Sequence, residues 1–160
     1  MDFYKLIAKG YTELYGEEQE IKHNIIKEAL NIRNTDLLLD VGCGACVSGF
    51  NCRVLGIDPS VELLKQNLGS QTILAKAENI PFRDNVFDKV ISVTSMHNFD
   101  NIEQSIKEIK RVGKKDFAFS ILKRTKNFDM IEQNIRDNFS IKKVIDGKQD
   151  WVFICSKVFK

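Results

Sequence analysis

The sequence contains no apolar run long enough to cross a bilayer and no secretory h-region near its amino terminus. It has only two prolines, no internal repeat and no low-complexity segment. A formal net charge of +2 over 160 residues does not indicate a nucleic-acid binder. We therefore expect one cytoplasmic domain over residues 1–160, large enough to bury a core and without a membrane partner.

Cysteine is also scarce, and three of the four cysteines lie close together at Cys43, Cys46 and Cys52. Without an export signal, reduced thiols are expected rather than a disulfide framework. A metal site would need a fourth ligand at suitable spacing, and Cys155 is remote in the sequence. We expect no metal centre and interpret these thiols as small buried side chains.

The feature that organises the chain is Leu37–Gly44, an apolar run that ends in Asp40 and then in two glycines. Such a short apolar run predicts a strand buried on both faces. A second apolar strand, Val54–Asp58, again ends in an acid. Open parallel sheets bind ligands at the carboxyl ends of their strands, so both acids are expected at one site. Glycines between them allow a sharp turn and a close approach of backbone to ligand.

The same turn distinguishes between nucleoside cofactors. A dinucleotide site needs a third glycine, and this chain has Val47 after Gly42 and Gly44. The acid Asp40 would repel a pyrophosphate but suits a ligand ammonium group, while Asp58 is placed to accept hydrogen bonds from ribose hydroxyls. A nicotinamide oxidoreductase is thus a weaker interpretation than a site for a cationic nucleoside.

Three motifs follow in order: LLLDVGCGACVSG, GIDPS and AENIPFRDNVFDKVISVTSMHNF. This series resembles class I S-adenosylmethionine-dependent methyltransferases. The resemblance implies an α/β three-layer sandwich, with a seven-stranded, mostly parallel sheet that ends in a C-terminal antiparallel hairpin. It also implies transfer of a methyl group from S-adenosylmethionine to an acceptor, which the sequence leaves open between RNA, protein and a small molecule, with or without a partner subunit.

The resemblance assigns Asp40 to the cofactor's amino group, Asp58 to its ribose and Ala77 to its adenine edge. The full set of cofactor-binding residues that it implies is Asp40, Gly42, Cys43, Gly44, Asp58, Pro59, Ala77, Glu78 and Thr94. Two positions depart from the family pattern: Cys46 replaces a third glycine, and Lys76 replaces an acid. They motivate an alternative function, a non-catalytic methyltransferase-like binding subunit of a larger complex.

No catalytic base is required unless the acceptor is a weak nucleophile. The candidate is His97, in the loop after the predicted strand 87–93, where it would line the acceptor pocket or take a proton. The alternative is a partly exposed loop histidine. Two basic clusters, at residues 110–115 and 123–126, would contact RNA phosphates or, as we favour, remain solvated.

The remaining predicted strands cover residues 72–75, 117–122, 139–145 and 151–156, with Asp146-Gly147 as a hairpin signal. Helices are predicted within 1–15, over 17–32, after Ser60 as N-cap, between Asp100 and Gly113, and over 127–138. In the resembling family, the N-terminal helices, residues 1–32, lie over the cofactor. Three detailed predictions are open to test. They are a buried stripe of Ile21, Ile25, Ala29 and Ile32, a second stripe of Val61, Leu64 and Leu68, and a capping box of Asp100 and Glu103.

Overall fold

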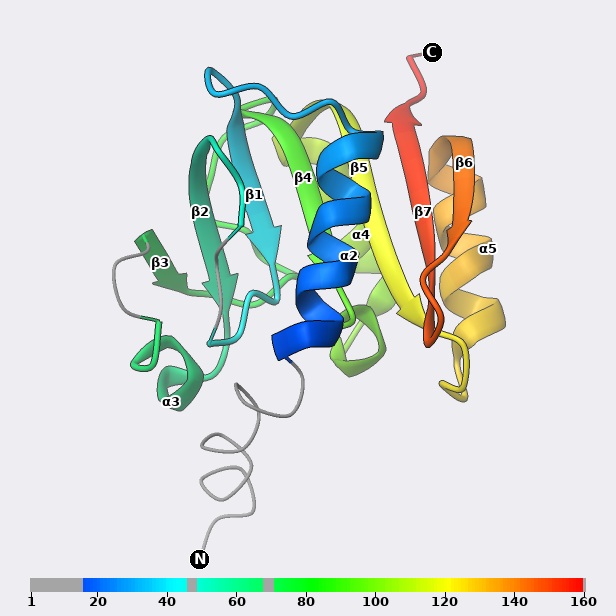
Figure 1. Ribbon diagram of the computed structural model, residues 1–160, viewed down its shortest axis with the longest axis horizontal. Helices are drawn as coiled ribbons and strands as arrows, with labels where there is room; N and C mark the ends of the chain where they lie inside the picture. The colour runs from blue at the N-terminus through cyan, green and yellow to red at the C-terminus, as the bar shows by residue number, and fades with distance from the viewer. Residues whose placement is uncertain (1–15, 46–48, 68–70, 160) are drawn as a thin grey trace, which may run out of the picture.

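Seven strands form one sheet in the order β3-β2-β1-β4-β5-β7-β6 in this computed structural model, which describes residues 16–45, 49–67 and 71–159 (Figure 1). The strands are β1 (Leu37–Val41), β2 (Arg53–Asp58), β3 (Gln71–Leu74), β4 (Phe87–Val93), β5 (Gly113–Leu122), β6 (Phe139–Asp146) and β7 (Asp150–Lys157). The helices are α2 (Gly16–Ala29), α3 (Val61–Leu64), the 3₁₀ helix η1 (Met96–Asn98), α4 (Ile102–Val112) and α5 (Phe128–Asn138). The helix predicted within residues 1–15, and Cys46, lie outside the described residues.

The strand order reverses at β1, which pairs in parallel with both β2 and β4. From there β3 extends the sheet on one side and β5 on the other, both in parallel. The antiparallel strand β7 then lies between β5 and β6. This arrangement confirms the predicted α/β fold with its C-terminal antiparallel hairpin. A ligand crevice is expected outside the carboxyl ends of β1 and β4, where the order reverses.

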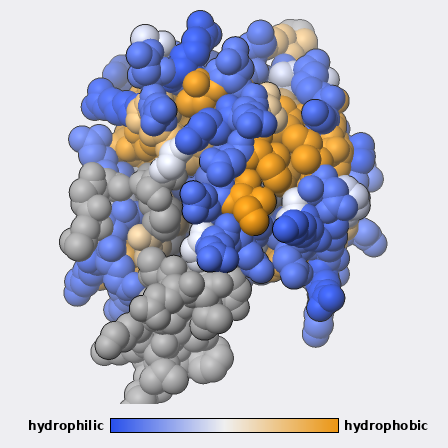
Figure 2. Space-filling model, viewed as in Figure 1, coloured by the Kyte–Doolittle hydropathy of each residue, from blue (hydrophilic) through white to orange (hydrophobic). Residues whose placement is uncertain are grey.

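Helices cover both faces of the sheet, α2 on one and α4 with α5 on the other (Figure 1). The core beneath α4 and α5 includes Phe117, Phe119 and Phe139, all buried. The core beneath α2 is smaller and joins Ile26 of the helix, and Leu30 directly after it, to apolar residues of β1, β4, β5 and β7. Apolar atoms remain visible beside α2 on this face (Figure 2). Among the described helices, none combines the length and apolarity that crossing a bilayer requires.

The face that α2 turns to the sheet differs from the predicted stripe. The buried residues are Lys22, His23 and Ile26, whereas Ile21 is 40% exposed. The predicted stripe was therefore wrong at its first position. The physical reason is that Lys22 finds a carboxylate beneath the helix, and a hydropathy pattern counts every lysine as an outward residue.

Two local helix predictions also need correction. The cap of α4 is Asn101, whose side chain accepts a hydrogen bond from the Gln104 N–H at 3.0 Å, while Glu103 pairs with Lys107 at 2.6 Å. The predicted capping box was one residue off. In α3 the predicted N-cap Ser60 is confirmed, but the helix spans only four residues and none of them is buried. Figure 1 places α3 near the carboxyl ends of β2 and β3.

The predicted hairpin joins β6 to β7, but its turn chemistry differs from the Asp-Gly signal. The residue with positive φ is Lys148 (φ 70°), not Gly147. The Asp146 carboxylate accepts the Lys148 N–H at 2.9 Å, and the Gly147 N–H donates to the Asp150 carbonyl at 2.9 Å. This closed turn fixes Asp150 as the first residue of β7.

Candidate functional site

The turn after β1 is held against the end of β2 by backbone hydrogen bonds. The N–H groups of Gly42 and Cys43 both donate to the Ile57 carbonyl, at 2.8 and 3.0 Å, and the Gly44 N–H donates to the Asp58 carboxylate at 2.9 Å. Gly42 and Gly44 have φ values of +77° and +58°, which side chains rarely adopt. A Cβ on Gly42 would also lie 2.5 Å from Ser95 Oγ. The glycine positions are thus required by geometry.

Two adjoining hollows open beside this turn and share Gly42, Pro59, Asn98 and Phe99 as walls. The larger has a volume of about 520 Å³ and includes Asp58, Ser60, Glu62, Leu63 and Ser95. The smaller has a volume of about 70 Å³ and includes Ala75, Lys76, Ala77, Glu78 and Asp100. The larger volume falls in the range of small-molecule sites, roughly 300–1,000 Å³. Together they form an elongated cavity from Asp58 to the loop after β3.

Asp40 is the least compensated polar group near the turn. Its side chain is buried, and Oδ1 has no hydrogen-bond partner among the described residues. Burial, and secondarily the charge of Asp58, raise the pKa of Asp40 to about 8. A buried carboxyl without a donor or cation is costly to ionise, so this group favours a positively charged neighbour.

Asp58 lies at the end of β2 and lines the larger hollow. Its Oδ2 accepts the Gly44 N–H at 2.9 Å and its Oδ1 accepts the Ser60 N–H at 2.8 Å. Burial raises the pKa of Asp58, and these two hydrogen bonds oppose that shift. Each carboxylate oxygen keeps a further lone pair, so Asp58 retains capacity to accept ligand hydroxyl groups.

The loop after β3 forms the far wall of the cavity. Ala77 is buried in the core, and Glu78 accepts the Asn101 N–H at 3.0 Å, which ties the loop to the start of α4. Lys76 forms an exposed ion pair with Asp100 at 2.8 Å on the rim. The lysine that replaces the family's acid is therefore engaged away from the cavity floor.

Five residues predicted at the site line neither hollow: Asp40, Cys43, Gly44, Thr94 and His97. The first three belong to the end of β1 and the turn beside the cavity. Thr94 instead contacts Lys22 and Asp150 on the side of α2. His97 is half-buried in η1, and burial lowers its pKa while Asp150 opposes the shift. The loop side chains that line the cavity are Ser95, Asn98 and Phe99. Sequence reasoning missed them, although the need for glycine at position 42 is a signal that a side chain packs there.

The cysteines give no sign of metal binding in the part of the chain that the structure describes, where no cluster of three His, Cys, Asp or Glu side chains occurs. Burial raises the pKa of the Cys52 thiol and, to about 12, that of Cys155. Both thiols are thus protonated and weakly reactive at neutral pH. Cys43 is buried in the glycine turn.

Several residues of the basic clusters are bound to acids. Arg111 contacts Glu108 at 2.7 Å and Asp84 at 2.9 Å. In the second cluster, Lys123 pairs with Asp146 at 2.6 Å. Side chains committed to such pairs are less available to RNA phosphates; whether the clusters contact RNA or remain solvated stays a prediction.

The family model described as "Methyltransferase domain" matches residues 39–121. An uncharacterized protein of Methanocaldococcus jannaschii, MJ1252, is 29% identical, with 92% of this chain aligned to 66% of that protein. The chain therefore spans about two thirds of the length of this curated relative.

Two solved structures share the fold. An S-adenosylmethionine-dependent methyltransferase from Aquifex aeolicus matches with a TM-score of 0.73 and 17% identity, over 87% of this chain and 92% of that one. A chain of the complex that contains the Haloferax volcanii Trm112 methyltransferase activator matches with a TM-score of 0.74 and 14% identity, over 99% of both chains. At these identities the likeness shows the fold alone.

Proposed function

Because the chain belongs to the methyltransferase-domain family, we propose that it transfers the methyl group of S-adenosylmethionine to an acceptor. The observation that carries this proposal is the glycine turn between Asp40 and Asp58, which opens onto an elongated cavity. A buried carboxyl beside the turn, without a hydrogen bond to its Oδ1 among the described residues, and the Asp58 carboxylate in the cavity wall match a ligand that is both cationic and a nucleoside.

The residues present fit this cofactor. The Asp40 carboxyl, whose Oδ1 has no described partner, would be satisfied by the cofactor's ammonium group. Gly42, Cys43 and Gly44 would offer backbone to the methionine moiety, and Asp58, followed by Pro59, would accept the ribose hydroxyls. At the far end, the backbone of Ala77 and Glu78 would face the adenine. Thr94 lines neither hollow and would affect the cofactor only through the adjoining Ser95, which does line the larger one.

When bound, S-adenosylmethionine supplies an electrophilic methyl group on a sulfonium that departs as a neutral thioether. The protein's task is then to orient donor and acceptor in line. The rigid turn and the Ser95–Phe99 loop perform that positioning. His97 is our candidate base for an acceptor that must lose a proton, because its lowered pKa keeps the imidazole neutral at pH 7. Unchanged turnover in His97→Ala would remove it from that role.

The acceptor class stays open between RNA, protein and small molecules. Action with a partner subunit is part of the proposal and is supported by the full-length likeness to a chain in a complex with the Trm112 activator. A cytoplasmic location is also proposed, and the protonated Cys52 and Cys155 thiols suit a reducing compartment.

Calorimetric titration of the protein with S-adenosylmethionine tests the cofactor site. We expect saturable binding that Asp40→Asn weakens by about tenfold or more, because a neutral amide cannot pair with the ammonium group. Asp36→Asn is the matched control: Asp36 is also buried and accepts the Arg33 N–H at 2.8 Å, but it directly precedes β1, at the opposite end of the strand from the glycine turn. No binding by the wild type would overturn the proposal.

Methyl-labelled S-adenosylmethionine with fractionated cell extract then identifies the acceptor. Label in RNA, protein or small molecules supports methyl transfer and names the acceptor class. Tight cofactor binding without label in any fraction would instead favour the non-catalytic binding subunit.

A further inference from the structure

We propose that the buried Lys22–Asp150 pair positions the cofactor pocket from outside it, by holding Thr94 in a left-handed backbone conformation that sets the loop over Gly42. Lys22 and Asp150 are positioning residues in this proposal, since neither lines the cavity beside the glycine turn. The identity of the ligand in this inference rests on the proposed function. The role of the Lys22–Asp150 pair in holding the loop after β4 does not.

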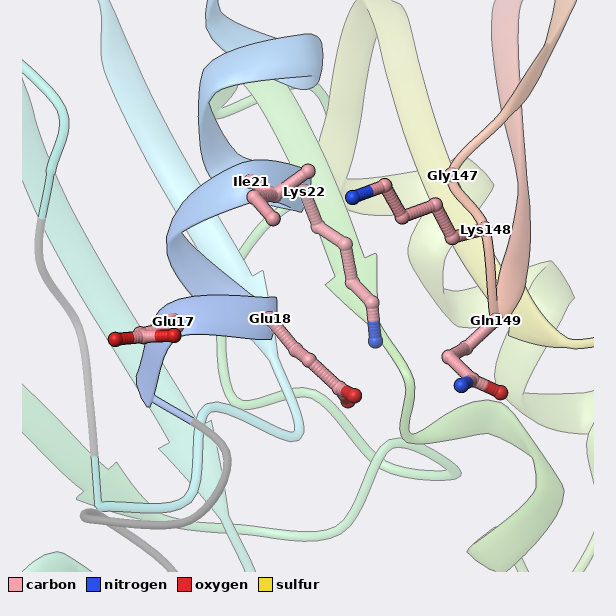
Figure 3. A pocket seen from close by; sticks show the side chains of 7 residues that line it. All are labelled: Glu17, Glu18, Ile21, Lys22, Gly147, Lys148 and Gln149. Carbon is pink, nitrogen blue, oxygen red and sulfur yellow. The ribbon is translucent and has the colours of Figure 1, made fainter.

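The pair belongs to a buried network that joins four elements. Lys22 Nζ of α2 lies 3.0 Å from Asp150 Oδ1 of β7 and donates to Thr94 Oγ1 at 2.9 Å. Thr94, directly after β4, donates to Asp150 Oδ2 at 2.7 Å, and Ser120 of β5 donates to the same oxygen. The Lys22 and Asp150 side chains are 3% and 0% exposed. Lys22 reaches from α2 toward the end of β4 (Figure 3).

Thr94 is the strained member of this network. Its φ is +52°, a region that β-branched residues almost never adopt without being held there. Val93 already faces α2, so strict alternation would send the next side chain to the opposite face. The left-handed turn instead places Oγ1 between Lys22 and Asp150. The Thr94 N–H still donates to the Ser120 carbonyl at 2.9 Å, so the residue is fixed through both backbone and side chain.

The next residue, Ser95, connects the backbone conformation of Thr94 to the cavity wall. Ser95 Oγ donates to the Val41 carbonyl at 3.0 Å and lies 2.7 Å from Ser92 Oγ. It packs so closely on Gly42 that a Cβ there would overlap it. Ser95, Asn98 and Phe99 then form the wall of the cavity. A change of backbone conformation at Thr94 would therefore displace that wall relative to the glycine turn.

A second lysine–aspartate pair, which is partly buried, offers a control. Lys89 of β4 lies 2.6 Å from Asp116 of β5, with side chains 8% and 30% exposed. These residues pair near the amino-terminal part of β4, away from the loop that follows its other end. Removing this pair removes a lysine–aspartate interaction from the strand that precedes Thr94 but leaves the contacts of Thr94 itself untouched.

The experiment compares Lys22→Met, Thr94→Val and the control Lys89→Met. Methionine keeps the length of the lysine stem, and valine keeps the shape of threonine while deleting its hydroxyl. Titration with S-adenosylmethionine, well below each melting temperature, is expected to show affinity reduced about tenfold in the first two variants and by less than about twofold in Lys89→Met. Should Lys22→Met fail to fold, Thr94→Val decides, because it leaves the ion pair in place.

A double variant distinguishes a positioning role of Lys22 from general destabilisation of the protein. Adding Thr94→Gly to Lys22→Met should restore most of the affinity, because glycine adopts a positive φ without needing to be held. A merely structural pair would leave the double variant as weak as Lys22→Met. Equal affinity loss in Lys89→Met would likewise overturn the proposal.

Hydrogen exchange of the cofactor-free protein gives a readout that does not depend on the proposed function. Amides of residues 94–99 should exchange faster in Lys22→Met and Thr94→Val than in the wild type, and at unchanged rates in Lys89→Met. Unchanged exchange in Lys22→Met and Thr94→Val would contradict the positioning role of the Lys22–Asp150 pair. If these two variants exchange faster but the wild-type protein does not bind S-adenosylmethionine, the positioning of the loop is supported and the cofactor assignment is rejected.

Discussion

Asp40 and Asp150 are two buried carboxylates on the α2 side of the same sheet, and they have opposite surroundings. Asp150 accepts hydrogen bonds from Thr94 and Ser120 and pairs with Lys22. Among the described residues, Oδ1 of each carboxylate lacks a hydrogen bond, but Asp150 Oδ1 lies 3.0 Å from the Lys22 ammonium group, whereas Asp40 has no ion pair there and its pKa is raised to about 8. Burial of an acid alone therefore says little about its role. What the protein provides as compensation separates a structural carboxylate from one that awaits a ligand.

The largest expected effect removes the compensation of Asp150. Lys22→Met leaves that carboxylate buried and unpaired, so we expect the free energy of unfolding to fall by about 3–5 kcal/mol in chemical denaturation. Adding Asp150→Asn should recover part of the loss, because the uncompensated charge is then gone. A loss below about 1 kcal/mol would show that the two aspartates do not differ in the way that we describe.

The glycine turn beside Asp40 gives the next largest effect. Gly42→Ala combines a positive φ with a Cβ only 2.5 Å from Ser95 Oγ, so we expect about 1–3 kcal/mol of destabilisation and loss of detectable cofactor binding. The control is Gly16→Ala, where an added Cβ meets nothing within 4 Å. Melting curves and calorimetry measure both. Retained affinity in Gly42→Ala would move the site elsewhere.

The pH dependence of the free energy of unfolding in Asp40→Asn tests whether Asp40 is uncompensated in the folded protein. The pKa of Asp40 is raised from 3.8 to about 8 in the folded protein, so its protonated form is favoured there. The stability that this contributes is complete below pH 3.8 and is lost as pH rises through about 8. The variant should therefore gain stability relative to wild type as pH increases from 4 to 8, by about 1 kcal/mol or more. Parallel pH profiles for the two proteins would contradict the shift.

The smallest effect expected at Asp40 is a proton released on binding. If the ammonium group of the cofactor ionises Asp40, titration at pH 7 in two buffers of different ionisation enthalpy should report release of up to about one proton. Asp40→Asn should abolish most of that release. Identical heats in both buffers for the wild type would show that Asp40 does not change its protonation state.

Most of the fold could be predicted because its signals are local. Leu37–Gly44 and Val54–Asp58 combine apolar runs with acids and glycines, and both became adjacent parallel strands. The hairpin followed from a turn signal between two apolar runs. Such features depend on a few neighbouring residues, which is what a single sequence displays.

The site was predicted less completely because its walls depend on residues far apart in sequence. Ser95 lines the cavity because it packs on Gly42, and no periodicity joins those positions. No prediction was made for Lys22 from the sequence, because its partner Asp150 lies much later in the chain and approaches it only when β7 joins the sheet. Thr94 was predicted to bind the cofactor, but its side chain contacts Lys22 and Asp150 and lines neither hollow.

The direction of β7 gives Asp150 an unusual dependence on the turn before it. Because β7 runs antiparallel to β5, its first residue rather than its last lies near the carboxyl ends of the parallel strands. Inserting one residue into the 147–149 turn would shift the strand by one position and exchange its inward and outward faces. Asp150, Val152 and Ile154 would then leave the α2 side together. A change in the length of this three-residue turn would therefore remove Asp150 from Lys22 and Thr94, so the length of the turn cannot vary freely.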